Sequence, residues 1–192
     1  FFILLSTSFF IFGKIKNDNF NSLENVEKSY LIKAISPNIS IDRFYSNKDE
    51  VKIINELITL SAPSKTKPTI YIWPEGIISD SHLKEMIEYR SLFLDNFGED
   101  DLIIMGLNSI DKESDKKMYF NSMVIFNNKL NVLAKYDKVN LVPFGEFIPF
   151  ESILGLIGLK TITNSYQSFS RGKSRSSLNI TNDKINLKLL PL

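Results

Sequence analysis

Three charged residues in two short motifs could together carry acyl-transfer chemistry. Glu75 closes the segment Trp73-Pro74-Glu75, while Lys138 and Glu146 belong to Tyr-Asp-Lys-Val-Asn-Leu-Val-Pro-Phe-Gly-Glu, which ends at Glu146. A glutamate at the end of a strand can act as a general base when burial raises its pKa towards neutrality. A lysine held beside a developing oxyanion stabilises a tetrahedral intermediate electrostatically.

Each of these residues also has a plainer interpretation when it is considered alone. Glutamates are mostly exposed in proteins, so Glu75 by itself is better described as a surface turn residue. Lys138 by itself would be a solvated lysine at a strand end, and Glu146 a turn residue before Phe147. The catalytic interpretation therefore rests on the occurrence of all three in one chain.

The composition excludes several other classes of site. The 192 residues contain 0 Cys and 1 His, His82, so they hold no disulfide, no thiol nucleophile and no cysteine-based zinc site. A histidine triad or zinc site is disfavoured as well, and we expect His82 to lie in the first turn of a helix. With a net charge of +1 and scattered basic residues, we expect no nucleic-acid partner, and the motifs call for no metal and no cofactor.

The chain starts with an apolar run over residues 1–12. A bilayer-crossing helix needs about 20 apolar residues, so the run alone is too short. We interpret residues 1–16 as the end and flank of a transmembrane helix; the alternatives are a buried first strand and an artefact of a fragmentary sequence. Lys14 and Lys16 weakly favour a cytoplasmic flank under the positive-inside rule. The mostly polar residues 17–29 are expected to form a linker.

Apolar periodicity and turn residues predict strands that alternate with helices in the first half of the chain. Ser81 is expected to cap the second helix, and Gly98 to end it. The predicted elements, in order, are strand 30–36, helix 49–60, strand 69–73, helix 81–97, strand 101–106, a charged turn 111–117, and a hairpin of 119–126 and 130–135. A short helix 151–159, a polar loop 164–177 and a strand 184–190 follow. This order predicts an α/β protein with a mixed sheet.

Together the motifs resemble one family closely. The stretch from Tyr136 to Pro149, with Trp73-Pro74-Glu75, Tyr-Phe-Asn-Ser at 119–122 and Ser-Phe-Ser-Arg-Gly at 168–172, resembles the extracytoplasmic domain of the apolipoprotein N-acyltransferases. These are membrane members of the nitrilase, or carbon-nitrogen hydrolase, superfamily. The resemblance covers residues 30–192 and implies a nitrilase-like αββα sandwich, incomplete at its C-terminal side.

The resemblance also implies roles, partners and a location. Glu75 matches the family's general base, Lys138 its triad lysine and Glu146 a further essential glutamate. The implied partners are a phospholipid acyl donor, the lipidated N-terminal cysteine of an apolipoprotein, and the bacterial inner membrane, with the domain on the periplasmic side. The periplasmic location conflicts with the cytoplasmic flank that Lys14 and Lys16 weakly favour.

In the family, the nucleophilic cysteine follows a strand that residues 184–190 resemble. We therefore expect that this sequence stops shortly before the nucleophile and is inactive in acyl transfer as written. Two alternatives remain at this point: a non-catalytic remnant of a split or decaying gene, and a soluble amidase of the same superfamily. The apolar start and the Phe-rich segment after Glu146 argue against the soluble amidase.

Overall fold

The computed structural model describes residues 2–22, 29–38, 50–78, 82–113, 116–150, 168–181 and 183–191. Within them lie three α-helices, one 3₁₀ helix and seven strands. In chain order these are α1 (Phe2–Asn21), β1 (Leu31–Ala34), α2 (Glu50–Ser61), β2 (Thr69–Ile72), the 3₁₀ helix η2 (Glu85–Tyr89), α3 (Arg90–Asn96), β3 (Leu102–Glu113), β4 (Lys116–Asn127), β5 (Val132–Asp137), β6 (Leu178–Thr181) and β7 (Asn186–Leu189). The predicted α/β class is confirmed.

The main sheet has five strands in the order β1-β2-β3-β4-β5. The first three strands are parallel, and the last three are antiparallel. Parallel neighbours need a crossover connection, which α2 supplies between β1 and β2, and η2 with α3 between β2 and β3. β4 and β5 follow one another through a short turn, as the hairpin prediction required.

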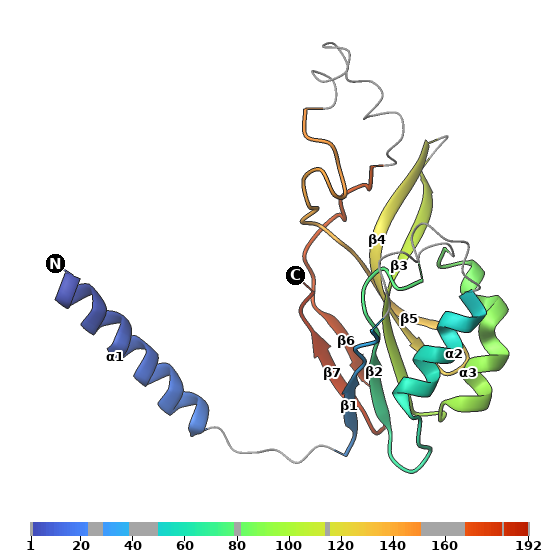
Figure 1. The fold of residues 1–192 in the computed structure, drawn as a ribbon, viewed down its shortest axis with the longest axis horizontal. Helices are drawn as coiled ribbons and strands as arrows, with labels where there is room; N and C mark the ends of the chain where they lie inside the picture. The colour runs from blue at the N-terminus through green and yellow to red at the C-terminus, as the bar shows by residue number, and fades with distance from the viewer. Residues whose placement is uncertain are drawn as a thin grey trace.

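One face of this sheet is covered by helices (Figure 1). Side chains alternate between the two faces of a strand, so Tyr71 and Ile103 point to the same face. They form one core with the apolar side of α2, including Ile54 and Leu57, and with Phe93 of α3. This core fixes the sheet against the helical layer.

The other face packs against a second sheet made of β6 and β7, which pair antiparallel. Ile70 and Ile104 contribute from the main sheet, and Ile180 and Leu187 from the smaller one. Both faces of β2 and β3 are thus buried, which explains their nearly continuous apolar sequences. The described residues therefore form three layers, helix, sheet and sheet, and no second helical layer is among them.

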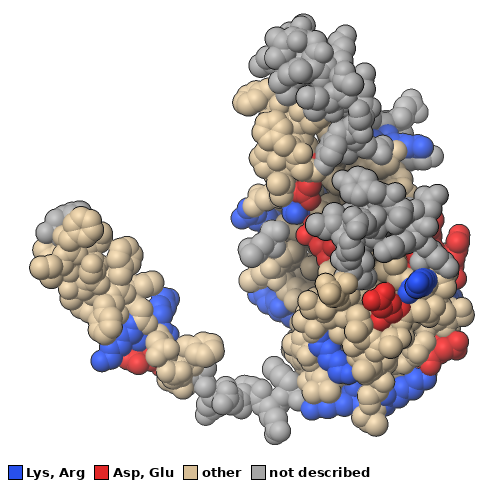
Figure 2. All heavy atoms as spheres, viewed as in Figure 1, with Lys and Arg blue, Asp and Glu red and all other residues tan. Residues whose placement is uncertain are grey.

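The apolar run at the start of the chain folds as the helix α1 (Figure 1). All of its side chains are exposed. The helix continues to Asn21, so the first residues of the predicted linker 17–29 are helical rather than extended. Across the described ranges, no helix combines the length and apolarity that a membrane crossing requires. On the face in Figure 2, acidic and basic groups are interspersed over the body, and the basic atoms of α1 lie towards its C-terminal end.

Several predicted boundaries were wrong. Residues 85–96 form η2 and then α3 instead of one long helix, and the C-cap residue is Phe97 in extended conformation, not a left-handed Gly98. His82 precedes η2 and bridges to Asn108 of β3, so it is not in a first helical turn. The predicted charged turn 111–117 is mostly strand, because β3 and β4 pair as far as Glu113.

Two further predictions concern the C-terminal part of the chain. The strand predicted at 184–190 is present as β7, but its partner β6 was not anticipated. The predicted Ser81 cap and the helix 151–159 lie outside the described residues. Residues 168–177, the described part of the predicted loop 164–177, form no helix or strand.

Candidate active site

Glu75 is presented by the turn that follows the parallel strand β2. Trp73 is 3% exposed, and its indole N–H donates a 3.0 Å hydrogen bond to the hydroxyl of Ser61, so the chain is anchored in the core immediately before the turn. Pro74 has no N–H to continue the ladder. The Glu75 side chain then points outward and is 61% exposed. The burial on which the predicted base chemistry depended is therefore not present in this structure.

Strand β3 passes very close to the turn that carries Glu75, and the contact point is Gly106. A Cβ atom on Gly106 would lie 2.9 Å from the Cα of Glu75 and 3.2 Å from its Cγ. Only a residue without a side chain allows this approach. Gly106 thus sets the distance between Glu75 and the hairpin strands beyond β3.

Asn121 on β4 and Lys138 at the end of β5 come from adjacent strands. The amide N–H of Lys138 donates to the carbonyl of Asn121 at 2.8 Å, which continues the antiparallel pairing one step past the end of β5. Both side chains reach towards Glu75. The hairpin therefore presents an amide donor and a cation to one carboxylate.

Glu146 lies in a compact turn after β5. Its backbone N–H donates to the carbonyl of Val142 at 2.8 Å, and its carboxylate accepts the N–H of Val142 at 2.8 Å. Pro143 and Phe147 close the turn through a bridge, and Phe144 takes a φ of 61°. The turn thereby folds the carboxylate of Glu146 back towards β5 with its side chain 12% exposed.

The side chains of these four residues converge on one point. The ammonium of Lys138 lies 3.2 Å from Oε1 of Glu75 and 3.0 Å from Oε1 of Glu146. The amide nitrogen of Asn121 donates to both of the same carboxylate oxygens. Lys138 and Asn121 therefore hold two carboxylates together that would otherwise repel each other.

This arrangement shifts the ionisation of the two less exposed members. Partial burial favours the neutral form of Lys138, but hydrogen bonds and charge from Glu146 and Glu75 outweigh it and raise the pKa of Lys138 above 10.5. Burial likewise opposes ionisation of Glu146. The N–H of Val142, with Lys138 and Asn121, outweighs that effect and lowers the pKa of Glu146 below 4.5. The pair is therefore charged at neutral pH.

A cavity of about 230 Å³ opens beside this cluster, between the two sheets. Its polar wall includes Glu75, Asn121 and Lys138, its apolar floor includes Ile104 from the inner face of the main sheet, and Pro191 lines it from the other side. Pro191 follows β7 almost directly. The backbone that leaves β7 is thus directed to the same space as the base and the cation.

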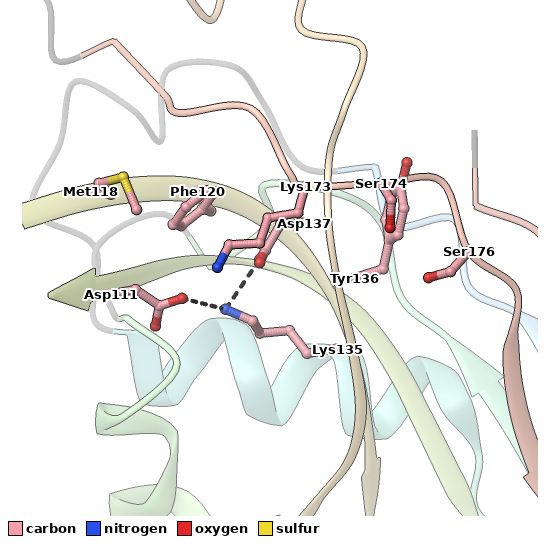
Figure 3. A pocket seen from close by; sticks show the side chains of 9 residues that line it. All are labelled: Asp111, Met118, Phe120, Lys135, Tyr136, Asp137, Lys173, Ser174 and Ser176. Atoms are coloured by element: carbon pink, nitrogen blue, oxygen red, sulfur yellow. Dashed lines mark hydrogen bonds and ion pairs between the residues drawn. The ribbon is translucent and has the colours of Figure 1, made fainter. Parts of the chain in front are cut away.

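A second cavity of about 430 Å³ lies further along the hairpin (Figure 3). Lys135 forms ion pairs with Asp111 at 3.4 Å and Asp137 at 3.1 Å inside it, so much of its charge is already compensated. Figure 3 shows Tyr136 with Ser174 and Ser176 on the side opposite Asp111. Tyr136 also lines the first cavity, while Glu75 and Lys138 do not line the second.

The sequence analysis singled out Glu75, Lys138 and Glu146, and the structure places all three within one cluster. It assigned no role to Asn121, although the motif that contains it was noted. The missed signal was register: Asn121 is in the strand that pairs with the segment ending at Lys138. Among the described residues, no group of His, Asp and Glu is arranged to hold a metal ion.

Sequence comparison finds relatives over most of the chain. The apolipoprotein N-acyltransferase of Allorhizobium ampelinum is 30% identical over 167 residues, which is 84% of this chain and 31% of that protein. The enzymes of the same name from Brucella suis and Caulobacter vibrioides are each 27% identical, over 83% and 78% of this chain and 31% and 30% of their own lengths. The chain thus spans about a third of these relatives. No family model matches it.

Several of the solved structures that the chain matches are amidases. An amidase from Nesterenkonia sp. AN1, a member of the nitrilase superfamily, matches with a TM-score of 0.47 and 12% identity over 88% of this chain and 58% of its own. An N-terminal amidase matches with a TM-score of 0.35 and 18% identity over 58% and 28%.

These comparisons confirm the resemblance that the motifs indicated. At the level of class, the solved structures described above are amidases, and one of them is described as a member of the nitrilase superfamily. More narrowly, its sequence is similar to the apolipoprotein N-acyltransferases, which are acyltransferases by name.

Proposed function

We propose that this chain is part of an apolipoprotein N-acyltransferase and supplies the base and the cation of its acyl-transfer site. The whole protein would move an acyl chain from a phospholipid to the amino group of a lipidated N-terminal cysteine. The observation that carries the proposal is the convergence of Glu75, Lys138 and Glu146 beside a cavity that Pro191 also lines. A chance set of surface charges would not meet around one ammonium group.

The proposed reaction has two halves. In the first, Glu75 accepts the proton of a thiol, and the thiolate attacks the ester carbonyl of the phospholipid. The ester C–O bond then breaks, and the departing lysophospholipid alcohol takes the proton back from Glu75. In the second half, the amino group of the acceptor attacks the thioester carbonyl and its proton passes to Glu75. The C–S bond then breaks, and the departing thiolate takes that proton back from Glu75, which regenerates the thiol. Covalent catalysis divides one difficult step into two easier ones.

Lys138 would stabilise the oxyanion that forms in each tetrahedral intermediate. Its ammonium is already oriented by Glu146 and Asn121 through their shared contacts, so little reorganisation is needed when charge develops. The thiol itself would come from a residue after β7, as the family resemblance implies. The position of Pro191 supports this arrangement, because it lines the same cavity as Glu75.

The proposal includes the membrane. We place the protein at the bacterial inner membrane with this site on the periplasmic side, within an αββα sandwich. The exposed apolar side chains of α1 support membrane contact: Phe9 is 68% and Phe10 72% exposed. Phe144 and Phe150, exposed near Glu146, would face the same apolar phase as the acyl donor.

The test is acyl transfer by the native protein purified in detergent from its source cells. A phospholipid with a labelled acyl chain is the donor, and a peptide with a diacylglyceryl N-terminal cysteine is the acceptor. We expect label on the acceptor amide, an intact mass well above 22.0 kDa, and loss of transfer in Glu75→Gln. The matched control is Glu56→Gln, an exposed glutamate of α2.

Three outcomes would overturn the proposal. Acyl transfer by the Glu75→Gln variant at the wild-type rate would show that Glu75 is not the general base. An intact mass near 22.0 kDa without any transfer would indicate a non-catalytic remnant. Hydrolysis of small amides without detergent, and no transfer, would indicate a soluble amidase.

A further inference from the structure

A short segment without regular structure crosses the candidate site on its outer side. Residues 169–172, here called the strap, donate three backbone hydrogen bonds to three separate parts of the site. Phe169 donates to the carbonyl of Glu146 at 2.8 Å, and Ser170 to the carbonyl of Tyr119 at 2.6 Å. Gly172 donates to the carbonyl of Lys138 at 3.0 Å. The strap therefore connects the Glu146 turn, strand β4 and the end of β5.

Two of these acceptors belong to the charged residues themselves. The backbones of Lys138 and Glu146 are held by amides only three residues apart on the strap. Their side chains meet at 3.0 Å. Among the described residues, no strand pairing joins the turn of Glu146 to the end of β5. The strap therefore adds a backbone connection between them to the ion pair of their side chains.

Gly172 is the point at which the strap lies closest to β5. A Cβ atom at this position would lie 2.0 Å from the carbonyl oxygen of Asp137 and 2.8 Å from its carbonyl carbon. Both atoms are backbone, so no side-chain rotation can relieve the overlap. Any residue larger than glycine must move the strap away from Lys138.

Arg171 adds a side-chain contact in the same direction. Its guanidinium lies 5.3 Å from the centre of the Phe147 ring, in a cation–π arrangement. Phe147 directly follows Glu146, so this contact acts on the same turn as the backbone bond from Phe169. The strap thus holds the turn through both its backbone and a side chain.

We propose that the strap, with Gly172 as its positioning residue, sets the distance between Lys138 and Glu146. The inference rests on the proposed function for its consequence in catalysis, but the geometry it describes can be tested without any acyl transfer. A strap displaced from β5 would let the Glu146 turn drift from Lys138. Glu146 would then lose the Lys138 contact, which, after the hydrogen bond from the N–H of Val142, favours its charged form.

The test is the titration of Glu146 by carboxyl NMR on the full chain, with the resonance assigned by Glu146→Gln. The charged groups around Glu146 are Lys138, which contacts it directly, and Glu75, which shares the Lys138 ammonium. Arg171 of the strap stacks on the neighbouring Phe147 and would move with the strap. Gly172→Ala changes the charge of none of the three. We expect Gly172→Ala to raise the titration midpoint of Glu146 by about 1 pH unit. A close opposite charge typically lowers the pKa of a carboxyl group by that amount or more, and the variant would lose this effect.

The matched control is Gly145→Ala, which adds the same methyl group within the turn itself. There the new Cβ would lie 3.4 Å from a Val142 side-chain carbon, an ordinary contact, so the midpoint should not change. A folded Gly172→Ala protein with an unchanged Glu146 midpoint would overturn the proposal. A shift in the NMR midpoint of the chain, together with no detectable acyl transfer by the native protein purified from its source cells, would support the role of the strap and contradict the proposed function.

Hydrogen exchange of the wild-type chain provides a second measurement that does not depend on whether Gly172→Ala folds. The amides of Phe169, Ser170 and Gly172 should exchange at least about 100-fold more slowly than in an unstructured peptide, because each is held in the folded site. Exchange of these three amides at the unprotected rate would show that the strap does not hold the site, and would overturn the proposal.

Discussion

At the scale of single residues, Lys138 connects the site, because its ammonium group forms ion pairs with both Glu75 and Glu146. Because the folded pKa of Glu146 is lowered, its stabilising effect is present above about pH 4.5 and is lost as the pH falls through the folded value. The pKa of Lys138 is raised, so its contribution is present below 10.5 and is lost above the folded value. The pair therefore stabilises the fold between these limits.

We expect Lys138→Met to lower the free energy of unfolding by about 2 kcal/mol at pH 7, the typical contribution of a hydrogen bond to a charged group. The difference from wild type should shrink below pH 4.5, where Glu146 becomes protonated in the variant first. Urea denaturation of the variant and the wild type at pH 7 and pH 3.5 measures the loss of stability and its decrease at low pH. Lys129→Met, at an exposed lysine of the β4–β5 turn, should stay within about 0.5 kcal/mol of wild type. An equal loss at both pH values would contradict the ion-pair explanation.

At the scale of elements, β3 determines how close Glu75 comes to the hairpin. We expect Gly106→Ala to displace the Glu75 turn, because the new Cβ would lie 2.9 Å from a backbone atom that cannot rotate away. Transfer activity of the native protein should fall by about 10- to 100-fold, as a misplacement near 1 Å typically does. The free energy of unfolding should fall by about 1 to 3 kcal/mol, as for other overpacked sites.

The comparison variant is again Gly145→Ala, where the added methyl group has room. It should retain activity and stability, because it makes only an ordinary contact with Val142. If Gly106→Ala transferred acyl chains at the wild-type rate, the close approach of β3 would not be what positions Glu75.

The elements also show what the sequence could and could not predict. Strong apolar periodicity placed α2 and β2 within a residue of their actual bounds. The continuation of β3 beyond Gly106 was missed because Asp111 and Lys112 look like turn residues, yet pairing with β4 extends the strand through them. Asn121 was missed for a similar reason: its role depends on cross-strand register, which local pattern does not contain.

At the scale of the whole molecule, α1 stands apart because its apolar side chains contact no core. We expect the full chain to float with phospholipid vesicles, and deletion of residues 1–22 to reduce the bound fraction strongly, since exposed apolar surface partitions out of water. Phe9→Ser with Phe10→Ser, which are 68% and 72% exposed in wild type, should reduce binding while retaining the helix. Equal flotation of the deleted and full chains would exclude α1 as a membrane contact.

The second property of the whole molecule is that the site lies at the edge of the interface between its two sheets. Pro191 lines the cavity of Glu75 and Lys138, and it follows β7, which is docked through apolar contacts that include the fully buried Ile185. We expect Ile185→Ala to lower the free energy of unfolding by about 2 to 5 kcal/mol, the usual cost of such a cavity. Leu190→Ala, at a residue 74% exposed, should change it by less than about 0.5 kcal/mol. Equal small losses in denaturant titrations of the two variants would mean that β6 and β7 are not bound to the main sheet in solution, and that the chain does not carry Pro191 to the site.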